Sequence, residues 1–96
     1  MPAYLTLFNW TEQGVRNVKD TAKRAKAARE AWEEAGGHII GIWWTFGQYD
    51  GFLVHVAPDD ATANRLLVGI GMQGNVRTTT LRAFGEEEIE SILENL

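Results

Sequence analysis

His55 is the residue in this sequence whose type is best suited to chemistry. It lies in the segment DGFLVHVA, whose alternating apolar residues are typical of a β-strand. The alternation places Val54 and Val56 on one face and His55 on the other. If the valines face the core, the imidazole lies on the open face, where it would act as a general base or as an axial ligand to haem. The alternative is a half-buried structural histidine that is hydrogen-bonded to Thr6, Tyr4 or a second chain.

Metal chemistry has few candidate ligands here. The only other histidine is His38, and there is no cysteine, which excludes disulfides, thiolate metal ligands and a cysteine nucleophile. A protein metal site needs several converging ligands, so we expect none. Haem needs only one axial ligand and an apolar slot, so we keep haem as an alternative cofactor; no other cofactor follows from the sequence.

Arg82 lies in the segment NVRTTTLRAF, which reads as the last strand and would place it on the same face as His55. Its planar guanidinium suits a carboxylate or a phosphate; the alternative is an ion pair with an acid of the C-terminal helix or of a second subunit. Threonine hydroxyls on this face would orient a polar ligand, or they are present only for strand propensity. The predicted ligand-contacting residues are Tyr4, Thr6, Phe8, Trp43, His55, Thr80 and Arg82.

The elements that must position these residues follow from apolar periodicity. Strands are predicted at residues 3–8, 38–45, 50–57 and 75–84. Helices are predicted to begin after the capping residues Thr11 and Asp59 and after Gly85, and Asp20-Thr21 would kink or split the first one. We expect the apolar residues of the last helix, Ile89, Ile92, Leu93 and Leu96, to point inward. The βαββαβ order plus a terminal helix predicts an α+β, ferredoxin-like sandwich with an antiparallel four-stranded sheet and both main helices on one face.

The register of the central hairpin decides which side chains share a face. If Phe46 roughly faces Asp50, Trp44 pairs with Phe52, and Trp43 joins His55 on the face without helices. A slip of one residue would exchange the two tryptophans. In the register with Phe46 opposite Asp50, the open face carries Tyr4, Phe8, Trp43, Leu53 and Phe84. This face is too apolar for water, so we expect a second subunit to cover it.

Composition limits the classes of function. The 96 residues fit a single domain over 1–96, and no long apolar run or leader is visible, so we expect a cytoplasmic protein that does not enter a membrane. Six of the nine basic residues lie on the first helix, but four acids share that helix and the net charge is −4. This mixture is typical of a solvated helix face, and we expect no nucleic-acid partner.

Several segments in the same order resemble the GYD-domain family. They are the N-terminal MPAYLTLFNWTEQGVRNVKD, the turn TFGQYD, the helix start APDD and the stretch GNVRTTTLRAFGEEE. The family is named for the residues that are here Gly47, Tyr49 and Asp50. The resemblance implies a ferredoxin-like fold of the dimeric α/β-barrel kind, in which two sheets face each other. It implies no established activity.

The predicted function is a small-molecule-binding module, a homodimer or larger oligomer whose facing sheets enclose a pocket. One alternative is an enzyme, either a cofactor-independent oxygenase or isomerase or a haem-handling enzyme. In that case His55 would be the base, and Arg82 or Tyr4 would stabilise an oxyanion. The other alternative is an assembly protein, whose open face only packs against a partner.

Overall fold

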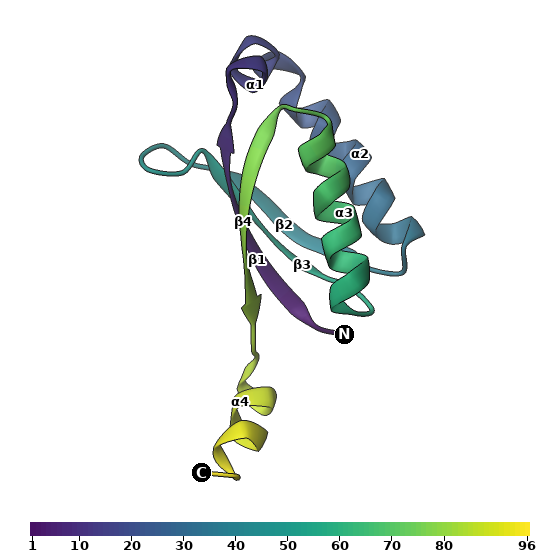
Figure 1. Cartoon of the computed structure of the whole chain (residues 1–96), viewed down its shortest axis with the longest axis vertical. Helices are drawn as coiled ribbons and strands as arrows, with labels where there is room; N and C mark the ends of the chain where they lie inside the picture. The colour runs from purple at the N-terminus through teal and green to yellow at the C-terminus, as the bar shows by residue number, and fades with distance from the viewer.

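The chain forms one antiparallel sheet with two helices on one face. The computed structural model describes all 96 residues. Its elements in chain order are β1 (Ala3–Trp10), α1 (Glu12–Arg16), the 3-10 turn η1 (Val18–Asp20), α2 (Thr21–Glu34), β2 (His38–Trp44), β3 (Gly51–Val56), α3 (Asp60–Met72), β4 (Val76–Ala83) and α4 (Glu86–Leu93). The strand order is β2-β3-β1-β4, and α2 and α3 lie side by side against the sheet (Figure 1). The α+β, ferredoxin-like prediction is confirmed.

Local capping explains where the helices begin. The Thr11 hydroxyl accepts a hydrogen bond from the Gly14 N–H at 3.0 Å, and an Asp59 carboxylate oxygen accepts from the Thr62 N–H at 2.7 Å. Each supplies an acceptor to a donor that has no partner inside its helix. The predicted break at Asp20-Thr21 is present, because η1 separates α1 from α2.

The predicted register of the hairpin is wrong by one residue. Trp44 pairs with Gly51, so that Trp43, and not Trp44, lies opposite Phe52. The connection is longer than predicted: the Thr45 N–H donates to the Asp50 carbonyl at 2.9 Å and closes a loop over residues 45–50. An irregularity between Ile39 and Gly41 also inserts one residue into β2, which is a β-bulge that periodicity does not reveal.

The faces of β1, β3 and β4 are exchanged relative to the prediction, whereas Gly41 and Trp43 of β2 lie on the face without helices, as predicted. The helix-covered face carries the buried residues Tyr4, Thr6, Phe8, Ile39, Leu53 and His55. The opposite face, which we call the open face, carries Leu5, Leu7, Gly41, Trp43, Phe52, Val54, Val56, Thr79 and Leu81, and the paired Asn9 and Arg77 lie on it beyond Leu7 and Thr79. The reason is volume: α2 lies on the sheet through an alanine-rich stripe, and large side chains of the sheet fill the space that the alanines leave.

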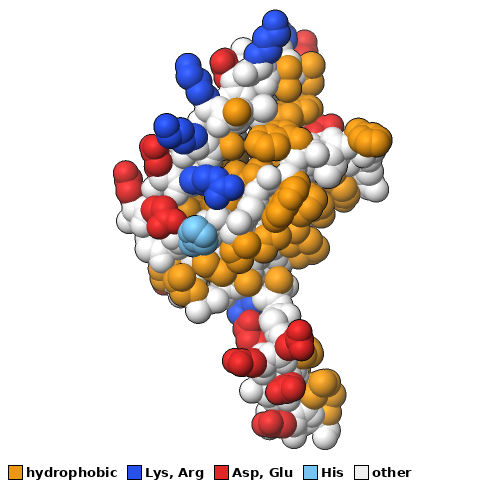
Figure 2. All heavy atoms as spheres, turned by 180° about the vertical axis from the view of Figure 1, so that it is seen from behind, with side chains coloured by type: hydrophobic (Ala, Val, Ile, Leu, Met, Phe, Trp, Pro, Cys, Tyr) orange, Lys and Arg blue, Asp and Glu red, His pale blue; other side chains and the backbone are white.

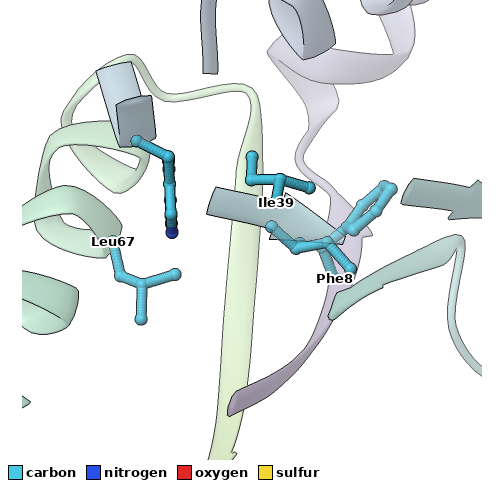
Figure 3. Packing of buried hydrophobic residues seen from close by; sticks show 5 residues of the cluster. Phe8, Ile39 and Leu67 are labelled. Atoms are coloured by element: carbon cyan, nitrogen blue, oxygen red, sulfur yellow. The ribbon is translucent and has the colours of Figure 1, made fainter. Parts of the chain in front are cut away.

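The main core cluster lies between the helices and the sheet. It consists of Phe8, Trp32, Ile39, Leu53 and Leu67. Figure 3 shows the Leu67 side chain of α3 together with Ile39 of β2 and Phe8 of β1. Trp32 is fully buried on α2 and supplies the bulk that the neighbouring alanines lack. This core lies directly beside the buried polar residues Thr6 and His55 of the same face.

The C-terminal helix does not pack as predicted. Helix α4 extends away from the sheet at the end of β4 (Figure 1), and all its residues are exposed. Ile89, Ile92 and Leu93, expected to point inward, are 41%, 44% and 53% exposed, and Leu96 just beyond the helix is 97% exposed. Helix α4 lies beyond the sheet and the two main helices, and none of its residues is buried (Figure 1).

None of the helices combines the length and the hydropathy that a membrane-spanning segment requires.

Candidate functional site

His55 lies at the centre of a chain of hydrogen bonds beneath α2. The Trp32 indole N–H donates to His55 Nδ1 at 3.2 Å, and His55 Nε2 lies 2.8 Å from Thr6 Oγ1. Because an indole can only donate, Nδ1 must be the acceptor and the ring proton lies on Nε2, which donates to Thr6. The Thr6 hydroxyl in turn lies 2.8 Å from the hydroxyl of Thr80. Every polar atom of the imidazole therefore has a partner.

The surroundings of His55 keep it neutral. The side chain is 0% exposed, and burial lowers its pKa from the ordinary 6.5 to about 4. The Tyr4 ring stacks on the imidazole with centroids 5.3 Å apart, and the Trp32 ring meets it edge-on at 5.2 Å. The two hydrogen bonds engage both ring nitrogens within the chain. The arrangement is that of the structural alternative, with the predicted hydrogen bond to Thr6.

Tyr4 and Arg82 are also engaged within the chain. The Tyr4 hydroxyl donates to the Asp60 carboxylate at 2.5 Å, and burial together with that carboxylate raises the pKa of Tyr4 to about 12. Arg82 Nη2 lies 3.0 Å from a Glu88 carboxylate oxygen of α4, which is the ion pair foreseen as the alternative to ligand binding. Hydrogen bonds from the Gly85 N–H and from Arg82 hold the pKa of Glu88 below its ordinary value.

The structure places six of the seven predicted ligand-contacting residues on the helix-covered side of the sheet and separates the seventh. Tyr4, Thr6, Phe8, His55, Thr80 and Arg82 occupy neighbouring rows of that side. Trp43 lies on the open face. A pocket that facing sheets would build from all seven is therefore wrong as predicted, because the sheet itself lies between Trp43 and the rest. Their individual roles toward a ligand stay predictions.

The open face has a regular arrangement of apolar rows. Across the strands from β2 to β4, one row is Gly41, Val54, Leu5 and Leu81, and the next is Trp43, Phe52, Leu7 and Thr79. The Trp43 ring folds back over Gly41, where an added Cβ would lie 2.2 Å from the ring, and it stacks on Phe52 with centroids 5.0 Å apart. Glycine at position 41 thus lets an indole lie flat on the sheet.

The same face has little capacity for polar chemistry. Its two central rows contain one hydroxyl, that of Thr79, and no charged side chain. Figure 2 shows hydrophobic side chains gathered over a broad area of the body, with charged side chains along one side of it. The chain also contains no cluster of three or more His, Asp or Glu side chains that could hold a metal ion. The open face is suited to contact with another apolar surface.

A second feature was missed at the level of sequence. A cleft of about 290 Å³ lies between α2, α3 and the helix-covered face of the sheet. Its walls include Phe8, Trp10, Arg24, Trp32 and Trp44. His55 does not line it. The only early sign was the alanine stripe of α2, because small residues over a sheet leave volume that the opposite side chains fill only in part.

The family of the chain follows from a match over nearly its full length. The family model described as the GYD domain matches residues 4–93. This chain belongs to the GYD domain family. The predicted resemblance to the GYD-domain family is thereby confirmed.

One relative of this GYD domain and one structure of similar fold come from Thermus thermophilus. One is named glutamine synthetase and cystathionine beta-lyase binding protein; it is 29% identical over 84 residues, which cover 86% of this chain and 88% of the relative. The crystal structure of TTHA0845 from the same species superposes with a TM-score of 0.54 at 21% identity, covering 88% of this chain and 95% of that one. The second likeness supports the fold alone.

The turn that gives the GYD domain its name has a structural explanation. Gly47 has a φ of +121°, a conformation that side chains with a Cβ rarely adopt. A carboxylate oxygen of Asp50 accepts a hydrogen bond from the Trp10 N–H at 2.8 Å, and the Thr45 hydroxyl donates to the Tyr49 carbonyl at 2.6 Å. The turn thus ties the hairpin loop to the end of β1.

Proposed function

We propose that this GYD domain is a self-associating protein-binding module whose open face packs against the same face of a second copy. The observation that carries the proposal is the pair of uncharged, apolar rows across all four strands. Soluble monomers rarely leave a contiguous apolar surface of this extent in water. A surface that offers contact area and almost no polar chemistry favours an assembly role over a catalytic one.

A second copy fits this face better than an unrelated partner would. In a two-fold dimer each patch meets itself, so the patch must tolerate its own charge distribution. The central rows carry no charge, although the chain as a whole carries −4, and two copies would therefore meet without like-charge repulsion. Leu5 and Val54 lie opposite each other on the two middle strands, where a two-fold axis would bury them most deeply.

Helix α4 supports the same assembly. Eight residues form too short a helix to be stable in water on propensity alone, so its apolar stripe needs a surface to pack against. Within its own chain α4 is held mainly by the ion pair from Arg82 to Glu88. We expect Ile89, Ile92 and Leu93 to pack on the second copy, next to the open faces.

Partner proteins are suggested by the named relative. A relative that covers 86% of this chain carries a name that describes binding to two enzymes, glutamine synthetase and cystathionine beta-lyase. We propose that this chain also binds enzymes, and these two are the first to test. The test is co-sedimentation of the purified chain with each enzyme from the same organism. Binding to neither enzyme would contradict this part of the proposal.

The self-association is tested by sedimentation equilibrium. Val54→Glu places a carboxylate at the centre of the open face, where burying it against a second copy would be strongly unfavourable. We expect the wild-type chain to sediment as a dimer and the variant as a folded monomer. Val68→Glu is the matched control, because Val68 is 54% exposed on α3, and it should remain a dimer. A monomeric wild type, or a Val54→Glu variant that stays dimeric, would contradict the proposal.

A further inference from the structure

We propose that the cleft between α2, α3 and the sheet binds a monocarboxylate with an apolar body, and that Arg24 holds its carboxylate. This site lies on the opposite side of the sheet from the open face. It is therefore independent of the proposed assembly, and each can fail without the other.

The walls of the cleft select an apolar ligand body. Aromatic rings from β1, β2 and α2 line it together with alanines of α2 and aliphatic residues of α3. The volume of about 290 Å³ is close to the lower end of the range for small-molecule sites, roughly 300 Å³. Thirteen of the twenty lining residues are hydrophobic, which is usual for such a site, and the polar ones are Thr21, Arg24, Arg65, Gln73, Asn75 and Thr78.

Arg24 supplies the polar group. Its Nη1 donates to the Asn17 carbonyl at 2.9 Å, which fixes the guanidinium at the cleft. Its Nη2 is buried and has no hydrogen-bond partner in the chain. The guanidinium also lies near the Trp10 ring, with Cζ 6.0 Å from the ring centroid. A buried guanidinium nitrogen without an acceptor is unfavourable, and a ligand oxygen would satisfy it with a charge-assisted hydrogen bond.

The charge around the cleft selects an anion with few charges. The charged residues that line it are Arg24 and Arg65, and no Asp or Glu is among them, although the chain has more acids than bases. A cation would find no counter-ion here. A polyphosphate would leave charges against apolar walls that cannot solvate them. One carboxylate on an apolar body matches both the guanidinium and the walls.

The experiment uses 3-phenylpropionate and octanoate as probes, with 3-phenylpropionamide as the neutral match to the first. Binding is measured by calorimetry and by NMR shifts of the indole N–H signals. We expect at least one acid to bind at one molecule per chain and to shift Trp10 and Trp44, and we expect the amide to bind at least tenfold more weakly. The two acids distinguish an aromatic from an aliphatic ligand.

Variants test the role of Arg24. Arg24→Gln should weaken binding of the acid about tenfold or more and should leave binding of the amide unchanged. Lys26→Gln removes one charge from the exposed side of the same helix and should leave both affinities as they are. Ala28→Leu, which keeps Arg24 but fills the cleft, should weaken the acid and the amide together.

Four results would overturn the proposal. The first is equal binding of the acid and its amide, and the second is unchanged acid binding by a folded Arg24→Gln. The third is a set of shifted signals at Leu5 and Val54 instead of the cleft. No binding by either acid would overturn it as well, and the dimer would be unaffected by any of these results.

Discussion

At the scale of single residues, His55 links the core to the edge of the sheet. It accepts from Trp32 on one side and donates to Thr6 on the other, and Thr6 lies against Thr80 on β4. Buried polar groups are stable only when their partners are complete, and this set joins three strands and one helix. Both nitrogens of the histidine thus have partners within the chain.

The buried imidazole makes stability depend on pH. The unfolded chain binds a proton on His55 below pH 6.5, whereas the folded chain does so only near pH 4. Between these values the unfolded state binds more protons, so the free energy of unfolding should fall by about 3 kcal/mol as pH falls from 6.5 to 4. Urea titrations at several pH values measure this slope.

Histidine variants separate this contribution from that of the acids. His55→Gln should lose most of the pH dependence between 4 and 6.5, and His38→Gln, which removes the exposed histidine, should keep it. Equal slopes in the wild type and His55→Gln would show that His55 is not buried and neutral as described.

At the scale of elements, two glycines of the central hairpin have different roles. A Cβ at Gly41 would meet only the far end of the Trp43 side chain, which can swing away. A Cβ at Gly51 would lie 2.2 Å from Phe8 Cζ and 2.6 Å from the backbone oxygen of Trp43, which cannot move without breaking the ladder. The close contact at Gly51 is therefore needed for the fold itself. The close contact at Gly41 determines how the Trp43 ring lies on the open face.

Alanine at each position tests this difference. Gly51→Ala should lower the free energy of unfolding by roughly 1–3 kcal/mol through overpacking, and Gly41→Ala by less than about 1 kcal/mol. Gly41→Ala should instead raise Trp43 from the sheet, change its near-UV circular dichroism and weaken dimerisation. Equal destabilisation by the two changes, with Trp43 unaltered, would contradict the described packing.

The sequence predicted the elements but not the faces. Helix caps at Thr11 and Asp59, the break at Asp20-Thr21 and the strand order of a ferredoxin-like sheet follow from local signals, and the structure contains them. The exchange of faces arises from packing between distant elements. Alternation in β1 and β3 is symmetric, so the choice of face depends on packing against α2 and α3, which includes the contact of Trp32 with His55.

The candidate site, too, could be predicted only in part from the sequence. The polar residues of β1, β3 and β4 were correctly grouped on one face, but periodicity could not show that they satisfy one another. The bulge near Ile40 and the loop over 45–50 separated Trp43 from them. The cleft at Arg24 could not be predicted from the sequence, because unfilled volume depends on side chains from both helices and from several strands.

At the scale of the whole molecule, one chain leaves two apolar surfaces without cover. They are the open face of the sheet and the stripe of α4, which lies beyond the body of the domain (Figure 1). Both would be buried at once if two copies met through their sheets. The relative from Thermus thermophilus is named for binding two enzymes.

The pairing of open faces is tested most directly by an isotope-filtered NOE experiment on a mixture of labelled and unlabelled chains. Only contacts between two copies give signals in this measurement. If the open faces pair, we expect cross-peaks between chains from the methyl groups of Leu5, Val54 and Leu81 and from the Trp43 ring. A spectrum without such cross-peaks, or with cross-peaks only from residues of α2 and α3, would contradict it.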